Sequence, residues 1–317
     1  MTDAVKTAFL FPGQGSQGAG MGKELANLYP EARETFEEAD EALGYKISEL
    51  CFEGPDEKLR LTEITQPAIL TVSVAAHRVI TKLGVKADYV AGHSLGEYSA
   101  HVAAGTMSFA DAVRTVRNRG KYMQEAVPEG LGAMAAIIAL TFEQVQSACE
   151  EAVAGTISEV CKAANINSPG QVVISGSKSS VEHAAEICKK KGAKRAIMLP
   201  VSAPFHCPLM QPAQDRLEKD INSLQLNDLL IPLMCNVDAR LIHTAAEARD
   251  TLIRQVTGSV LWAKSVGELI GLGVEQFVEI GPGTALSGML RQIDKSKKCV
   301  NACDEASLAK LREQFGL

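Results

Sequence analysis

The chain has 317 residues, of which 46% are hydrophobic and 22% are charged, and its formal net charge is −6. This length suits one large globular domain or two smaller ones, and the acidic balance argues against a general nucleic-acid binder. The longest apolar run, residues 131–140, is about half as long as a membrane span, and the N-terminal run is too short for a signal-peptide core.

The N-terminal part predicts one strand, a glycine-rich loop and a series of helices. The strand is expected at residues 5–11, and helical periodicity dominates from residue 22 to residue 83. Pro67 is suited to the first position of a long helix, where a missing N–H breaks no hydrogen bond.

The loop at residues 13–18 has the form Gly-x-Gly-x-x-Gly, which is also the dinucleotide-binding fingerprint. That fingerprint requires a second strand ending in Asp or Glu about twenty residues further on. Residues 31–41 are helical and acidic instead, so a loop that donates N–H groups to an oxyanion fits the pattern better. An NAD(P)-binding oxidoreductase remains an alternative.

Residues 92–96, Gly-His-Ser-Leu-Gly, have the form of a nucleophile elbow, Gly-x-Ser-x-Gly. An apolar strand is expected at residues 89–91 and a helix at residues 97–104, which is the strand–turn–helix context that the motif requires. The sharp turn would expose the Ser94 hydroxyl to a substrate carbonyl, and the helix N-terminus offers N–H groups to a developing oxyanion. The alternative is a purely structural turn.

A helix expected over residues 108–125 places Arg119 among apolar residues. Its apolar stripe consists of Ala112, Val116, Gly120 and Met123. A buried guanidinium is costly unless an anion meets it. The anion is either an internal carboxylate or a substrate carboxylate, which arginine would bind with two parallel hydrogen bonds. In the second case the enzyme selects acyl groups that end in a carboxylate.

The segment from residue 132 to residue 199 has the pattern of a small unit of its own. Thr141 and Gln144 form a capping box at the start of its first helix. Its expected elements, in order βαββαβ, are strands at 133–139, 160–165, 171–175 and 194–199 and helices after residue 141 and at 179–191. This order is that of a ferredoxin-like domain.

We therefore expect an α/β fold in which a ferredoxin-like small subdomain is inserted into a large α/β-hydrolase-like subdomain. The large subdomain would comprise residues 1–130 and 200–317, and the small one residues 131–199. Clefts between such parts often bind ligands.

A serine nucleophile needs a base, usually histidine. Of the six histidines, His206 stands in a two-proline segment, residues 203–208, at the junction of the subdomains, where it can face the cleft. The His93 side chain should leave the elbow in another direction than the serine. The remaining four have no special setting: His77, His101, His183 and His243. No acidic residue stands in a distinctive loop as a third triad member, so a carbonyl could orient the imidazole.

Basic residues cluster at one helix end of the small subdomain, at Lys189, Lys190, Lys191, Lys194 and Arg195. Such a cluster is either a solvated helix C-terminus favoured by the helix dipole or a docking patch for an acidic partner. The eight cysteines include no Cys-x-x-Cys pair. We expect free thiols in the cytoplasm and no metal site.

Taken together, these motifs resemble those of the malonyl-CoA:acyl carrier protein transacylases of bacterial fatty-acid synthesis, over nearly the full length. The shared motifs lie at residues 11–17, 92–98, 119–120, 167–171, 204–206, 254–255 and 281–283. The resemblance implies that Ser94 is the nucleophile and His206 its base, oriented by the main-chain carbonyl of Gln255. It also implies an oxyanion hole formed by the backbone N–H groups of Gln14 and Leu95.

The resemblance further implies that Arg119 binds the free carboxylate of malonyl and that Gln66 lines the same pocket. Many stand-alone members carry serine where this chain has Phe205. In related polyketide acyltransferases a phenylalanine there accompanies malonyl, so Phe205 should narrow the pocket against an α-methyl group.

The implied reaction is ping-pong transfer of malonyl from CoA to the phosphopantetheine thiol of acyl carrier protein, through a malonyl-serine ester. The CoA thioester is a substrate, so no cofactor is expected. The expected partners are malonyl-CoA and acyl carrier protein, with the lysine cluster as docking patch, and the chain should be a cytoplasmic monomer that binds neither nucleic acid nor membrane. A serine thioesterase or lipase on a similar elbow and a non-enzymatic carrier-protein binding module are further alternatives.

Overall fold

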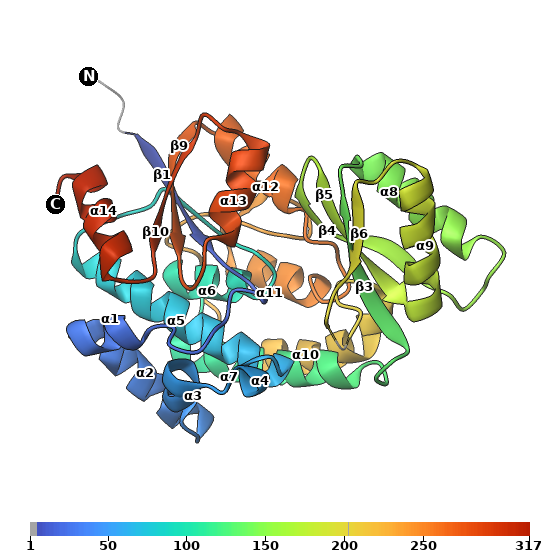
Figure 1. The fold of residues 1–317 in the computed structure, drawn as a ribbon. Coiled ribbons are helices and arrows are strands. Elements are labelled where there is room, and N and C mark those ends of the chain that lie inside the picture. Colours follow the sequence, from blue (N-terminus) through green and yellow to red (C-terminus); the bar gives the residue numbers. More distant parts are fainter. Residues whose placement is uncertain (1–4, 202) are drawn as a thin grey trace.

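The structure, a computed structural model, describes residues 5–201 and 203–317 (Figure 1). The strands of its large sheet are β1 (Lys6–Phe11), β2 (Tyr89–Gly92), β7 (Leu233–Met234), β8 (Leu241–Ile242), β9 (Val274–Ile280) and β10 (Lys298–Ala302). They lie in the order β10-β9-β1-β2-β7-β8, and all neighbours are parallel except the pair β7 and β8. Since parallel strands are covered on both faces, β1 and β2 are almost continuously buried.

Helices cover both faces of this sheet (Figure 1). Along β1, Phe9 and Phe11 enter one hydrophobic core, whereas Ala8 and Leu10 enter a second core on the opposite face. This alternation follows from the period of two in a strand. The helices are α1 (Lys23–Leu28), α2 (Pro30–Leu43), α3 (Ile47–Glu53), α4 (Asp56–Leu59), α5 (Thr62–Lys82), α6 (Gly96–Ala103), α7 (Phe109–Glu125), α10 (Gln211–Ser223), α11 (Ala245–Arg254), α12 (Trp262–Gly271), α13 (Ala285–Ile293) and α14 (Glu305–Phe315), with a 3₁₀ turn η1 (Pro208–Met210).

A second, antiparallel sheet forms the other end of the molecule. Its elements are β3 (Gly132–Ile138), α8 (Phe142–Val153), β4 (Cys161–Ser168), β5 (Gln171–Ser177), α9 (Lys178–Lys190) and β6 (Arg195–Met198). The strand order is β4-β5-β3-β6, and α8 and α9 pack on one face. The expected order βαββαβ and the mixed α/β fold class are confirmed. The capping box is confirmed too, because Thr141 and Gln144 exchange side-chain-to-backbone hydrogen bonds.

The prediction for Pro67 is wrong, because α5 begins five residues earlier, at Thr62. Pro67 therefore lies inside the helix, where it has no N–H to donate to the carbonyl of the preceding turn. Most of α5 is buried against α2 and α7, and this packing outweighs the local preference. The strand expected at residues 160–165 is also longer than expected, since β4 continues to Ser168.

None of the helices in the described part of the chain has both the length and the apolarity to cross a membrane.

Candidate active site

Ser94 occupies a strained turn between β2 and α6. Its φ of 51° lies in the left-handed region, which a residue with a side chain rarely adopts. A Cβ on Gly92 would lie 1.9 Å from the backbone of Gly96, and a Cβ on Gly96 would lie 2.0 Å from the carbonyl oxygen of Phe11. Both glycines of the motif are therefore required by the backbone, as in a nucleophile elbow.

Asn236, two residues after β7, stabilises this turn through hydrogen bonds to its backbone. Its Oδ1 accepts a hydrogen bond from the Ser94 N–H at 2.7 Å, and its Nδ2 donates to the Gly92 carbonyl at 2.7 Å. Because one buried amide holds both arms of the elbow, the N–H of Ser94 itself is occupied. The next N–H, that of Leu95, has no acceptor among the described residues.

His206 faces the serine hydroxyl. Its Nε2 lies 2.7 Å from Ser94 Oγ, while its Nδ1 lies 2.9 Å from the carbonyl of Gln255 and 3.1 Å from that of Gly258. Carbonyl oxygens only accept, so Nδ1 carries the proton and Nε2 is free to take one from the serine. Burial, aided by the charge of Arg119, lowers the pKa of His206 to about 3, so the ring is a neutral base at pH 7.

Arg119, only 1% exposed, reaches the serine from α7. Its Nη1 donates to Gln66 Oε1 at 2.9 Å, and its Nη2 donates to Gln255 Oε1 at 2.9 Å and to Ser94 Oγ at 3.1 Å. In the described structure these acceptors are all neutral. The sequence left open whether an internal carboxylate or a substrate carboxylate binds this guanidinium. No carboxylate of the described residues contacts it, so a buried cation without an anionic partner lies beside the nucleophile.

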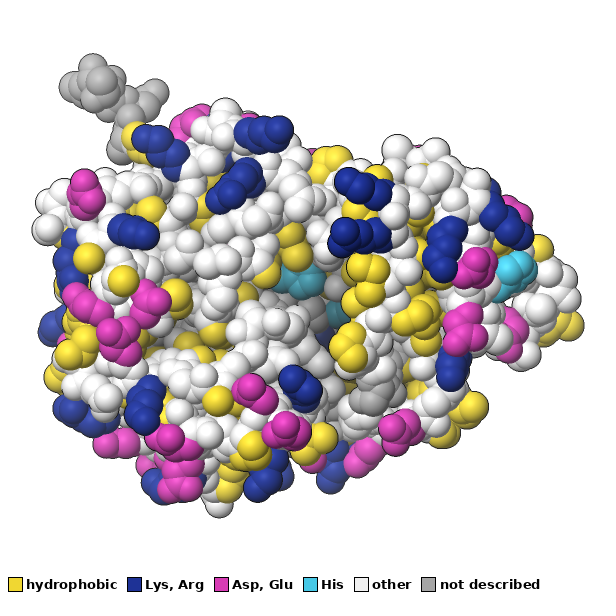
Figure 2. Space-filling model, viewed as in Figure 1, with side chains coloured by type: hydrophobic (Ala, Val, Ile, Leu, Met, Phe, Trp, Pro, Cys, Tyr) yellow, Lys and Arg dark blue, Asp and Glu magenta, His cyan; other side chains and the backbone are white. Residues whose placement is uncertain are grey.

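These groups line a cavity of about 110 Å³ between the two sheets. Its wall combines Gln14, Gln66, Ser94, Arg119, Phe205 and His206 from the large part with side chains of β3, β4 and β5. The Gln14 N–H, like that of Leu95, is bonded to no described residue. Figure 2 shows a hollow at this place, with histidine visible in it. Every predicted site residue thus lies at the cavity or, for Leu95 and Gln255, directly behind it.

His93 is also among the residues that line this cavity. It is not bonded to the serine, because its Nε2 lies 2.8 Å from Asn167 Oδ1 and its ring packs edge-on against Trp262. The elbow exposes the Ser94 side chain to the cavity, and the preceding residue, His93, also lies at the cavity wall.

Two polar residues behind the site escaped the sequence analysis, Asn236 and Glu97. Glu97 is fully buried, and its Oε2 accepts hydrogen bonds from the Asn236 N–H at 2.9 Å and from Gln255 Nε2 at 3.0 Å. Burial raises the pKa of Glu97 to about 7. Signals existed for both, because Asn236 follows a strand of the parallel sheet and Glu97 is an acidic residue in an otherwise uncharged stretch of helix.

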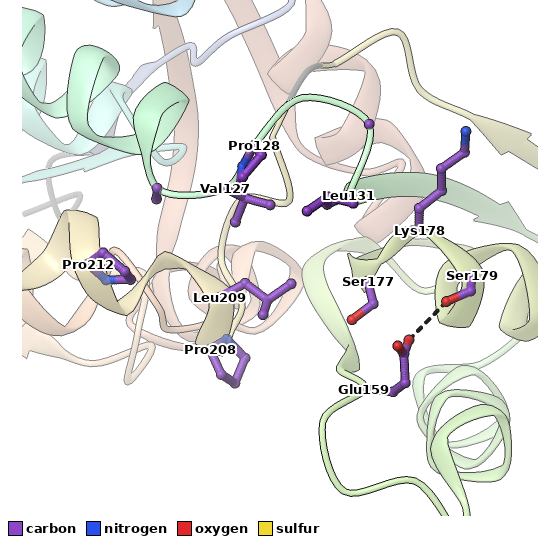
Figure 3. Close-up of a pocket in the computed structure, with 12 residues that line it drawn as sticks. Val127, Pro128, Leu131, Glu159, Ser177, Lys178, Ser179, Pro208, Leu209 and Pro212 are labelled. Atoms are coloured by element: carbon purple, nitrogen blue, oxygen red, sulfur yellow. Dashed lines mark hydrogen bonds between the residues drawn. The ribbon is translucent and has the colours of Figure 1, made fainter.

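A larger cavity, of about 640 Å³, lies apart from these residues, between the end of α7, the start of α9 and η1 (Figure 3). Its wall is mostly apolar and includes Val127, Leu131 and Leu209, together with Lys178 and Glu159. Glu159 is bonded to Ser179 at 2.9 Å. Since none of the residues that converge on Ser94 lines it, the smaller cavity is the candidate active site.

The chain is similar to known acyl transferases over almost all of its length. Residues 8–313 match the acyl transferase domain family. The malonyl CoA-acyl carrier protein transacylase of Escherichia coli K12 is 52% identical over 287 residues, which cover 90% of this chain and 92% of that protein.

Solved structures of similar proteins show the same fold. The acyl carrier protein S-malonyltransferase of Vibrio cholerae is 47% identical, with a TM-score of 0.94 over 96% of this chain and 99% of that chain. A malonyl-transacylase in complex with its type II PKS acyl-carrier protein is 44% identical, with a TM-score of 0.94 over 98% and 99% of the two chains.

Proposed function

Because the chain belongs to the malonyl CoA-acyl carrier protein transacylases, and so transfers malonyl from CoA to acyl carrier protein, we propose that Ser94 carries the malonyl group as an ester between the two thiols. The observation that supports this role is the 2.7 Å contact of Ser94 Oγ with a histidine whose other nitrogen is fixed by backbone carbonyls. A base oriented in this way needs no carboxylate.

In the first half-reaction His206 Nε2 takes the Ser94 proton while Oγ attacks the thioester carbonyl. The N–H groups of Gln14 and Leu95, which have no acceptor among the described residues, stabilise the tetrahedral oxyanion. The carbon–sulfur bond then breaks, and the proton on His206 passes to the leaving thiolate of CoA. The malonyl-serine ester remains.

In the second half-reaction the phosphopantetheine thiol of acyl carrier protein gives its proton to His206 and attacks the ester carbonyl. The bond between the acyl carbon and Ser94 Oγ breaks, and the proton returns to the serine. The cavity of about 110 Å³ leaves little room for water beside the acyl group, which favours transfer over hydrolysis.

Arg119 recognises the free carboxylate of the malonyl group in this proposal. Its Nη2 contact with Ser94 Oγ is given up once the serine is acylated, which frees a donor for the substrate. Gln66, bonded to Nη1, fixes the plane of the guanidinium. Phe205 closes the cavity beside His206 and narrows it against an α-methyl group.

The direct test is intact mass spectrometry after mixing the enzyme with malonyl-CoA and no acceptor thiol. We expect one malonyl group per chain, mapped to Ser94 and removed by added holo acyl carrier protein. A thioesterase would release free malonate without accumulating the adduct. A carrier-binding module or a nicotinamide oxidoreductase would show no adduct, and the oxidoreductase would bind NAD(P)H in a fluorescence titration.

We further infer that the basic cluster at the end of α9 docks acyl carrier protein. In the described structure Lys189 and Lys191 pair with glutamates, whereas Lys190, Lys194 and Arg195 are exposed with no ion pair. Figure 2 shows basic side chains over this part of the molecule, beside the hollow. A similar malonyl-transacylase has been solved with its acyl-carrier protein. Complementary charge mainly speeds association and sets specificity.

Reversing two of these charges, Lys194→Glu with Arg195→Glu, is expected to raise KM for acyl carrier protein about tenfold, because the acidic partner is then repelled. The KM for malonyl-CoA should change little. Steady-state kinetics with each substrate varied measures both values. Lys82→Glu, at the exposed end of α5, is the matched control, and equal effects of the two changes would argue against the docking patch.

We propose that the monomer is the working unit, because the base His206 and the cation Arg119 both contact Ser94 within one chain. We propose that residues 131–199 form the small subdomain and that residues 1–130 and 200–317 form the large one, with residues 1–4 and 202 outside the described structure.

Eight cysteines without a disulfide framework in the sequence favour a cytoplasmic location.

A further inference from the structure

The positive charge of Arg119 is buried, yet its hydrogen-bond acceptors in the described structure are uncharged. A carboxylate stands one residue further away along the hydrogen-bond chain. Gln255 Oε1 accepts from Arg119 Nη2 at 2.9 Å, and Gln255 Nε2 donates to Glu97 Oε2 at 3.0 Å. A neutral amide thus separates a buried cation from a buried anion.

Glu97 is incompletely bonded for a buried carboxylate. Its Oε2 accepts two hydrogen bonds, but its Oε1 is inaccessible to solvent and has no partner among the described residues. Protonation at Oε1 would remove the charge without breaking either bond at Oε2. The site can therefore hold this carboxyl group in both charge states.

The groups around Glu97 favour different states. Arg119 on α7 and the donors on Gln255 and Asn236 favour the ionised carboxylate, while burial and the negative charge of Asp238 oppose it. Tyr98 on the same helix and Cys235 after β7 also face it, and both remain neutral because burial raises their pKa. Arg119 is the one cation among these neighbours.

We infer that Glu97 is the counter-ion of Arg119 in the free enzyme and takes up one proton from solvent when the malonyl carboxylate docks on that arginine. The inference rests on the proposed role of Arg119. Two carboxylates and one guanidinium in a dry site would leave a net negative charge, which is costly. Protonation of Glu97 removes that charge, whereas an acetyl group has no carboxylate to compete for Arg119.

A definite pH dependence follows. Well below pH 7 Glu97 is protonated before and after docking, so malonyl binding involves no proton uptake. Above the pKa of about 7, Glu97 is ionised in the free enzyme and must be protonated on binding, so malonyl affinity falls as pH rises. The affinity for acetyl-CoA should not follow this trend.

The test is isothermal titration calorimetry with malonyl-CoA in buffers of different ionisation enthalpy, at about pH 8. Ser94→Ala is used so that no acyl group is transferred, and it is compared with the double variant Ser94→Ala, Glu97→Gln. We expect uptake of most of one proton by the first protein and none by the second. Glutamine keeps an acceptor for Asn236 and Gln255 but cannot be ionised, so the second protein should bind malonyl-CoA about tenfold more tightly. Acetyl-CoA is the control for protons taken up by the CoA phosphates.

Absence of proton uptake in Ser94→Ala, or equal uptake in the double variant, would overturn the inference. If the double variant does not fold, the pH dependence of KM for malonyl-CoA in the unaltered enzyme decides, and a flat profile from about pH 6 to about pH 8.5 overturns it. Arg119→Ala separates the two proposals. If the preference of Arg119→Ala for malonyl survives, the proposed role of Arg119 fails. If that preference is lost but Ser94→Ala, in which Arg119 is intact, takes up no proton, only the role of Glu97 fails.

Discussion

His206→Ala is expected to slow the formation of malonyl-enzyme about 10³-fold, because the serine then has no base within hydrogen-bond reach. In the structure Nε2 is 2.7 Å from Ser94 Oγ, and the ring is held by carbonyls that do not depend on the substrate. The remaining rate reflects the oxyanion donors and Arg119, which the substitution leaves in place. Rapid-quench measurement of the ester during a single turnover gives the rate directly.

Two controls separate lost chemistry from lost structure. Ser94→Ala should form no ester at all, whereas free imidazole added to His206→Ala should enter the vacated space and restore part of the rate. Imidazole should have no effect on Ser94→Ala. A malonylation rate within tenfold of the original enzyme for His206→Ala would remove this residue as the base.

The parts of the fold that were predictable from sequence are those governed by local rules. The elbow is recognisable because a Cβ at Gly92 or at Gly96 would lie less than 2.5 Å from neighbouring backbone atoms. Only glycine fits at these two positions, so sterics fix the spacing of the motif. The ferredoxin-like order follows from alternation, helical periodicity and the Thr141 capping box. Pro67 was misplaced because burial of α5, a property of the whole fold, overrode a local preference.

The site was predictable only in part, for the same reason. Arg119 was recognisable as a cation on an apolar stripe, but the identity of its neighbours depends on residues more than a hundred positions away, such as Gln255. The roles of Asn236 and Glu97 arise where the end of β7 meets the start of α6, and no pattern within either segment encodes that contact. Residues that act through other residues are therefore the hardest to infer from one sequence.

Arg119→Ala is expected to reverse the preference of the enzyme from malonyl to acetyl groups. Loss of a buried charged partner costs about 3 kcal/mol, which corresponds to about a 100-fold fall in kcat/KM for malonyl-CoA. The kcat/KM for acetyl-CoA should hold or rise, because removing the guanidinium leaves an apolar space next to Met123, which also lines the cavity.

The measurement is the ratio of the two kcat/KM values, obtained by competition between malonyl-CoA and acetyl-CoA for the same enzyme. Arg119→Lys is the matched variant: it keeps the charge but not the planar pair of donors, so it should retain an intermediate preference for malonyl. Gln255 accepts a hydrogen bond from Arg119 through its side chain and holds His206 through its main-chain carbonyl. A control must therefore show that the substitution does not displace His206. Arg119→Ala should still form acetyl-Ser94 at an undiminished rate. An unchanged malonyl-to-acetyl ratio in Arg119→Ala would mean that another group binds the substrate carboxylate.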